Sequence, residues 1–154
     1  MKLRILDVLT SKRLIGNLGE KEAAKLLKRK GYKILERNYT ALGAEIDIIA
    51  RSKDVTAFVE VKTRDEKYLG YKEARPGSSV TPEKQRKIIK VANHYNAKHK
   101  SNTRLRLDVI EVYLETVGST KKVKEVKHIE GAFDLNSAYN SEYAYKRKKE
   151  GSNL

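Results

Sequence analysis

Two acidic residues and a lysine lie in neighbouring segments that alternate apolar and polar side chains. Asp47 falls within residues 45–50 (EIDIIA), and Glu60 and Lys62 fall within residues 56–62 (TAFVEVK). Both segments are rich in β-branched residues and a short polar turn joins them, which predicts a β-hairpin. Carboxylates beside a lysine can hold a hard divalent cation and stabilise negative charge at a phosphodiester. This hairpin is therefore the first candidate for chemistry.

The register of the hairpin decides which side chains share a face. A two-residue turn at 53–54 places Asp47 directly opposite Glu60 and Glu45 opposite Lys62. Alternation then sends four apolar side chains to the other face, which we expect to be core: Ile46, Ile48, Val59 and Val61. Like charges opposite each other destabilise a sheet unless they are offset, and a divalent cation would offset them. The alternative is a solvated ladder of ion pairs such as Glu45–Lys62.

A third acidic residue lies on the apolar stripe of a predicted helix. Residues 16–30 (GNLGEKEAAKLLKRK) have a helical pattern that stops at Gly31, and residues 1–15 are expected to form a short basic arm or an extra helical turn. Glu20 shares its stripe with Ala23, Ala24 and Leu27. Because carboxylates are rarely buried without a partner, Glu20 is a candidate site residue. The alternative is a first-turn glutamate stabilised by the helix dipole.

A second helix is predicted from Thr81-Pro82 to about Lys98, with Thr81 as its N-cap. Lys84 and Arg86 flank Gln85, which shares a face with Ile88, Ile89, Ala92 and Tyr95. Gln85 either points toward the acidic site or caps the edge of the core.

The remaining segments complete a mixed α/β pattern. Further strands are predicted at 32–39, 105–115 and 122–129. The order is then helix, three strands, helix, two strands, which predicts a mixed sheet with helices packed on it. We expect one domain over residues 1–135 and a weakly ordered basic tail over 136–154.

Asp108 and the three histidines lie outside this pattern. Asp108 either extends the acidic site or, as the better interpretation, is a buried acid paired with a nearby arginine. His94, His99 and His128 lack metal-binding spacing and are interpreted as structural or surface residues.

A long polar segment, residues 63–80, joins the hairpin to the second helix. It carries basic and aromatic side chains, including Arg64 and Tyr68, which suit phosphate contacts and base stacking. An exposed, solvated loop is the alternative interpretation.

Composition narrows the class of protein. The 154 residues carry 34 Lys and Arg against 20 Asp and Glu, a formal net charge of +14, which suits a polyanionic partner. The lack of cysteine excludes disulfides, thiol catalysis, zinc fingers and Fe–S clusters. No apolar run approaches the ~18 residues of a membrane span, and charges interrupt the N-terminal apolar stretch, so we expect a cytoplasmic protein with no membrane partner.

These residues resemble a known group of proteins. Gly19-Glu20, Glu45-Ile46-Asp47, Glu60-Val61-Lys62 and Lys84-Gln85-Arg86 stand in the order and spacing of the YraN-like family of predicted nucleases. That family is similar to the PD-(D/E)xK, or restriction-endonuclease-like, superfamily and to archaeal Holliday-junction resolvases. The resemblance covers about Arg13 to Phe133; where the family commonly has glycine before the Glu-Ile-Asp run, this chain has Ala44 beside Gly43.

The resemblance implies a restriction-endonuclease-like mixed sheet and a role for each matching residue. Asp47 and Glu60 would be ligands of Mg²⁺ or Mn²⁺, with the Val61 carbonyl as a third ligand. Lys62 would be the catalytic lysine, and Glu20 the helix acid that completes the site. Arg64, Tyr68, Lys84, Gln85 and Arg86 are the candidate nucleic-acid contacts.

Together the residues and the resemblance favour a metal-dependent DNA endonuclease, with DNA preferred over RNA. Branched or irregular DNA as substrate, and a homodimer, rest on the resemblance alone. The alternative is a non-catalytic nucleic-acid-binding protein on a nuclease scaffold. A complete acid–acid–lysine set argues against that alternative, because a binding protein gains nothing from carboxylates beside a phosphate.

Overall fold

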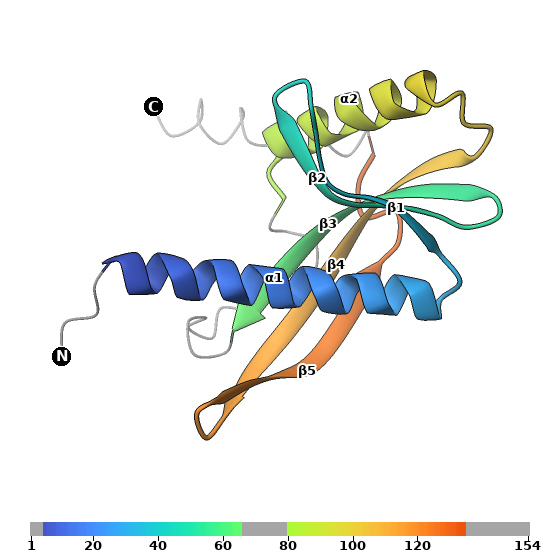
Figure 1. Ribbon diagram of the computed structural model, residues 1–154. Coiled ribbons are helices and arrows are strands. Elements are labelled where there is room, and N and C mark those ends of the chain that lie inside the picture. The colour runs from blue at the N-terminus through green and yellow to red at the C-terminus, as the bar shows by residue number, and fades with distance from the viewer. Residues whose placement is uncertain (1–4, 66–79, 135–154) are drawn as a thin grey trace, which may run out of the picture.

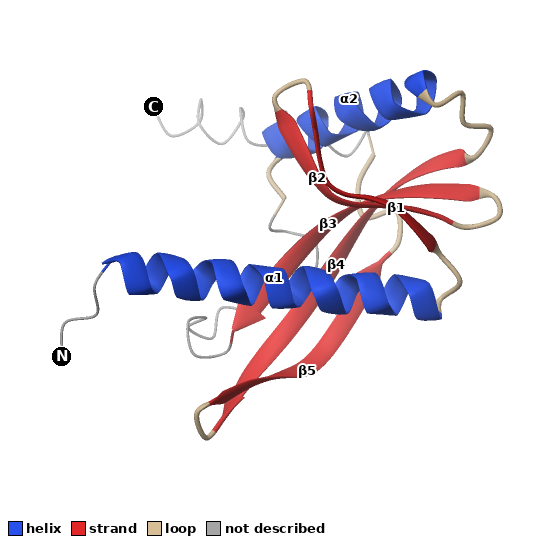
Figure 2. Cartoon of the chain, in the orientation of Figure 1, coloured by secondary structure: helices blue, strands red, loops and turns tan. Residues whose placement is uncertain are grey.

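The predicted order of elements is confirmed by the computed structural model (Figures 1 and 2), which describes residues 5–65 and 80–134, with side chains from Lys12 onward. The elements are α1 (Ile5–Arg29), β1 (Lys33–Ala41), β2 (Ala44–Arg51), β3 (Val55–Asp65), α2 (Pro82–Lys98), β4 (Arg104–Val117) and β5 (Thr120–Ile129). The helix α1 begins at Ile5, so most of the segment expected to be a basic arm or an extra helical turn is helical. Tyr68 and the predicted tail lie outside the described residues.

The five strands form one mixed sheet in the order β1-β2-β3-β4-β5. Three neighbouring pairs are antiparallel, and β3 pairs in parallel with β4 through the crossover that contains α2. The helix α2 begins as expected: the Thr81 side chain accepts a hydrogen bond from Lys84 N at 3.3 Å, and Pro82 occupies the first turn.

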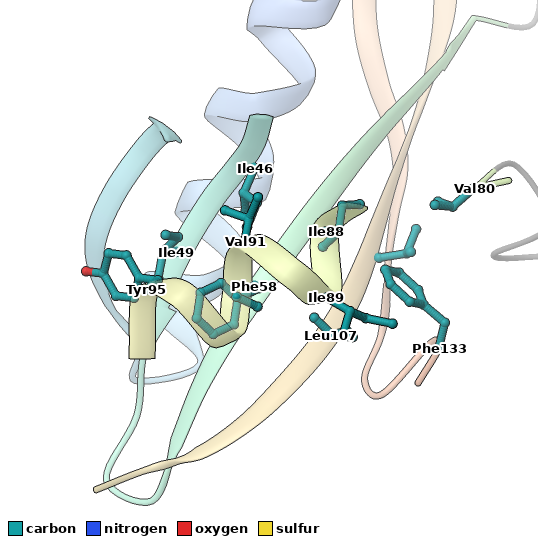
Figure 3. Close-up of a cluster of buried hydrophobic side chains, with 12 residues drawn as sticks. Ile46, Ile49, Phe58, Val80, Ile88, Ile89, Val91, Tyr95, Leu107 and Phe133 are labelled. Atoms are coloured by element: carbon teal, nitrogen blue, oxygen red, sulfur yellow. The ribbon is translucent and has the colours of Figure 1, made fainter. Parts of the chain in front are cut away.

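The two helices cover opposite faces of the sheet. On one face, Ala23 and Leu27 of α1 pack against Ile48 and Val59. On the other face, Ile88 and Tyr95 are among the α2 residues that pack with the strands (Figure 3). Phe58 and Tyr39 contact Tyr95 edge-to-face at centroid distances of 5.7 and 5.1 Å. The central strands are therefore buried on both sides, which holds them rigidly.

The hairpin has the predicted register where its strands pair, from Ile48↔Val59 to Arg51↔Thr56. Two details of the prediction are wrong. Ile46 packs on the α2 face with Phe58, whereas Ile48 packs on the α1 face, so the alternation of β2 is interrupted between them; on β1, Asn38 at this level has a left-handed backbone (φ 51°). Lys62 pairs with Glu60 rather than Glu45, because β2 and β3 stop pairing before they reach Glu45.

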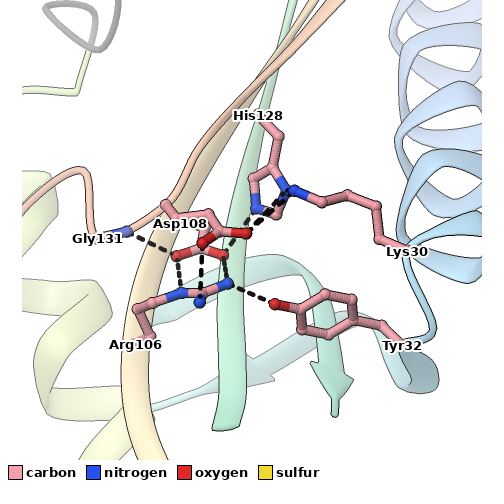
Figure 4. Close-up of polar contacts among 7 residues, drawn as sticks. Lys30, Tyr32, Arg106, Asp108, His128 and Gly131 are labelled. Carbon is pink, nitrogen blue, oxygen red and sulfur yellow. Dashed lines mark hydrogen bonds and ion pairs between the residues drawn. The ribbon is translucent and has the colours of Figure 1, made fainter.

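A cluster of charged side chains at the end of α1 confirms that Asp108 is paired with an arginine (Figure 4). Arg106 donates to Asp108 Oδ1 and Oδ2, both at 2.8 Å, and the Gly131 N–H donates to Oδ1 at 2.9 Å. His128 Nε2 lies 2.8 Å from Oδ2, while its Nδ1 lies 2.7 Å from Lys30 Nζ. Because an ammonium can only donate, Nδ1 accepts and Nε2–H donates to Asp108. His128 is thus the structural residue that the sequence predicted.

At Gly19, α1 packs directly against Thr63 of β3. A Cβ atom there would lie 1.8 Å from Thr63 Oγ1 and 2.9 Å from Thr63 Cβ. We expect Gly19→Ala to lower the free energy of unfolding by about 1–3 kcal/mol, because α1 must shift away from β3. Urea denaturation measures this.

Gly16, in the same helix, is the matched control. A Cβ atom there meets nothing within 4 Å. Gly16→Ala should therefore raise stability by up to ~1 kcal/mol through helix propensity. Equal stability of the two variants would show that the contact at Gly19 is unimportant.

Candidate active site

Asp47 and Glu60 come together at the point where β2 and β3 stop pairing. Glu60 is only 4% exposed, and Asp47 Oδ2 accepts a hydrogen bond from Val61 N–H at 2.7 Å. Burial raises the pKa of Asp47 to about 7, aided by the charges of Glu60 and Glu20 and opposed by the Val61 N–H and Lys84. The protein thus holds Asp47 in an environment that disfavours its charge unless a cation is near.

Two lysines share one oxygen of this acid pair. Lys62 Nζ lies 3.2 Å from Glu60 Oε1, and Lys84 Nζ, at the start of α2, bonds the same oxygen. Burial alone would lower the pKa of Lys84, but its hydrogen bond to Glu60 and the charges of Glu60 and Asp47 outweigh burial and raise it. We call Asp47, Glu60, Lys62 and Lys84 the acid–lysine cluster. Lys84, predicted as a nucleic-acid contact, thus touches the acids directly.

Glu20 approaches the cluster from α1. The tight packing of Gly19 on Thr63 sets α1 against β3, and the charge of Glu20 reaches Asp47 strongly enough to raise its pKa. Asn38, with its amide nitrogen directed at the acids, donates to Glu45 Oε1 at 3.1 Å and to Glu20 Oε2 at 3.3 Å. Sequence reasoning missed Asn38, although asparagine is one of the few residues that tolerate a left-handed backbone.

The other predicted site residues lie at varying distances from the cluster. Gln85 is buried beside Lys84, and its Nε2 donates to the Val80 carbonyl at 2.9 Å. Its amide therefore stabilises the start of α2 and does not contact the acids. Arg64 lies further along β3 than Lys62, and its Nη2 is 3.5 Å from the buried carboxylate of Glu111 on β4. Arg86 is exposed on α2.

The cluster offers a partial ligand set for a hard cation. In the part of the chain that the structure describes, no group of three or more His, Asp or Glu side chains is arranged to hold a metal ion. Mg²⁺, however, usually takes only one or two carboxylates from a protein and completes its shell with water and substrate phosphate. Asp47 and Glu60 supply two. The Val61 carbonyl points to the same strand edge as its N–H, toward Asp47, beyond the last β2–β3 pair. These oxygens fit Mg²⁺ or Mn²⁺.

Fold and site together define a small mixed α/β domain with acids and lysines gathered on its central strands. The profile of the Uncharacterised protein family UPF0102 matches residues 19–112, and the chain belongs to this family, the YraN-like family that its motifs resemble. The matched span begins at Gly19 and contains the whole acid–lysine cluster.

Curated relatives match nearly their whole length. A UPF0102 protein of Acetivibrio thermocellus is 44% identical over 126 residues, which cover 80% of this chain and 93% of that protein. A UPF0102 protein of Clostridioides difficile is 46% identical over 119 residues, which cover 77% of this chain and 95% of that protein.

Among the described helices, none has the length and apolar character needed to cross a membrane.

Proposed function

We propose that this protein is a divalent-metal-dependent endonuclease that hydrolyses phosphodiester bonds in DNA, on a restriction-endonuclease-like fold. The observation that carries the proposal is the acid–lysine cluster: two carboxylates forced together at a strand edge, with a lysine two residues beyond one of them. In a structural ion-pair ladder each acid would have its own cation, whereas here both lysines bond Glu60, and burial and repulsion raise the pKa of Asp47 to about 7.

Each residue of the cluster has a defined task under this proposal. Asp47, Glu60 and the Val61 carbonyl would hold Mg²⁺ or Mn²⁺, which when bound supplies a water of lowered pKa and neutralises charge on the phosphodiester. Lys62 lies beside that position, where its ammonium stabilises negative charge as it develops on the phosphate. Glu20 adds a further negative charge that favours the cation.

The surface next to the cluster suits a polyanion. The exposed face of α2 carries Arg86, Lys90 and Lys98, and the one acidic residue of this helix, Glu83, is paired with Lys87 at 3.3 Å. The helix begins at the cluster, so the basic face extends from it over ~18 Å. Such a face attracts the phosphate backbone. Branched DNA as substrate, and action as a homodimer, extend the proposal through the resemblance to Holliday-junction resolvases.

The proposal is tested by cleavage of a substrate panel in Mg²⁺ and in Mn²⁺. The panel contains supercoiled plasmid, a four-way junction, a flap, single-stranded DNA and structured RNA. We expect the wild type to cut DNA and Lys62→Ala to cut ~10²–10³-fold more slowly with binding retained, because one stabilising charge is lost.

Lys53→Ala, in the exposed β2–β3 turn, is the matched control and should cut like the wild type. Binding without cleavage by the wild type, on every substrate and with both metals, would instead favour a nucleic-acid-binding protein that retains a nuclease scaffold.

A further inference from the structure

Two ammonium groups contact the same carboxylate oxygen in the acid–lysine cluster. Lys62 Nζ and Lys84 Nζ both bond Glu60 Oε1, and Glu60 is almost fully buried. A buried carboxylate needs a nearby positive charge, so at least one of these lysines stabilises the fold as Glu60's counter-ion.

The two lysines differ in how readily the side chain of each can move away from Glu60. Lys62 projects from β3, the same rigid strand as Glu60 and two residues away, and it is 28% exposed. Lys84 projects from the first turn of α2 and is 43% exposed, at the edge of the basic helix face. A long lysine side chain at a helix end can swing into solvent with little change in packing.

The geometry points to Lys84 as a resident counter-ion that a divalent cation displaces from Glu60. This inference rests on the proposed function, since it requires Asp47 and Glu60 to hold that cation. A cation held by Asp47 and Glu60 would lie beside the Lys84 ammonium on the same Glu60 carboxylate, and two positive groups so close together repel each other. The ammonium then leaves toward the exposed face of α2, where it meets the incoming phosphates.

This exchange has two consequences. Without a cation, Glu60 keeps a positive partner although the charges of Asp47 and Glu20 lie nearby. Cation affinity is correspondingly weakened, because binding must break the Lys84–Glu60 ion pair. A cation and a substrate phosphate would therefore assist each other, since the phosphate provides a new partner for the displaced ammonium.

Calorimetric titration of Mn²⁺ into the full chain, without nucleic acid, tests the exchange. We expect Lys84→Met to bind Mn²⁺ at least tenfold more tightly than the wild type, because no ammonium opposes the cation. Lys84→Arg should remain close to the wild type, because it keeps a positive counter-ion. Lys87→Met is the matched control three residues along the same helix, and its Mn²⁺ affinity should equal that of the wild type.

Thermal unfolding is the second measurement, and it shows whether the Lys84→Met variant is folded. Lys84→Met should unfold at a lower temperature than the wild type in chelator and should gain more from saturating Mn²⁺. Mn²⁺ affinity of Lys84→Met equal to or weaker than wild type would overturn the displacement and leave the endonuclease proposal standing. Failure of both proteins to bind Mn²⁺ would overturn the metal site itself, and the displacement with it.

Discussion

An Asp47→Asn protein is expected to lose cleavage by ~10³-fold or more and yet to be more stable than the wild type at pH 8. The loss follows if Asp47 is a metal ligand, because a neutral amide is a poor substitute for a carboxylate beside a phosphodiester. The gain follows because partial burial and the nearby charge of Glu60 raise the pKa of Asp47 to about 7. Removing the charge relieves a penalty on the order of 1–3 kcal/mol at pH 8.

The pH dependence of that gain has a definite sign. The pKa of Asp47 is raised from 3.8 to about 7 on folding, so the folded state binds the proton more tightly than the unfolded state. The penalty is therefore complete above about pH 7, shrinks as the pH falls from 7 toward 3.8, and vanishes below 3.8. Urea denaturation at pH 8, 6 and 5 should show the advantage of Asp47→Asn becoming smaller at each step.

Asp54→Asn, in the exposed turn of the same hairpin, is the control and should follow the wild type at all three pH values. An Asp47→Asn protein that is less stable than the wild type at pH 8 would show that Asp47 is a structural residue. Its bond to the Val61 N–H would then outweigh its repulsion by Glu60.

The acid pair could be predicted because the register of a hairpin follows from its turn and from alternation over a few residues. The same reasoning failed at Ile46, because the alternation of β2 is interrupted between Ile46 and Ile48, which lie on opposite faces. Alternation assumes regular strands, and the segment of β1 that pairs here contains Asn38, whose backbone is left-handed.

The contact of Lys84 with Glu60 could not be predicted from the sequence, for a different reason. Lys84 lies 24 positions beyond Glu60 in the chain, and only the crossover through α2 brings the two together. Its helix face could be predicted from periodicity, since Gln85 and Ile88 are buried as expected. The position of that helix along the sheet depends on how its Tyr95 packs against Phe58 of β3, which no spacing rule supplies.

Asp108→Asn should have the opposite effect from Asp47→Asn, although both are acids within strands of one sheet. Asp108 is fully buried but accepts four hydrogen bonds, from Arg106, His128 and the Gly131 N–H. Burial alone would raise its pKa, yet the bonds from His128, Arg106 and Gly131 lower it overall. Its contribution to stability is thus present at neutral pH and is lost as the pH falls below its ordinary value of 3.8.

We expect Asp108→Asn to lower the free energy of unfolding by about 3–5 kcal/mol at pH 7, because the mostly buried Arg106 loses the charged partner that accepts two of its hydrogen bonds. Glu130→Gln removes a 45% exposed partner of the same arginine and should cost less than ~1 kcal/mol. A decrease of less than ~1 kcal/mol in the free energy of unfolding of Asp108→Asn would mean that the charged cluster at the end of α1 does not stabilise the fold. The pair of results would separate the two aspartates by their partners: Asp108 accepts four hydrogen bonds that stabilise its charge, whereas the bond shown for Asp47 comes from the Val61 N–H and, under our proposal, a cation supplies the rest.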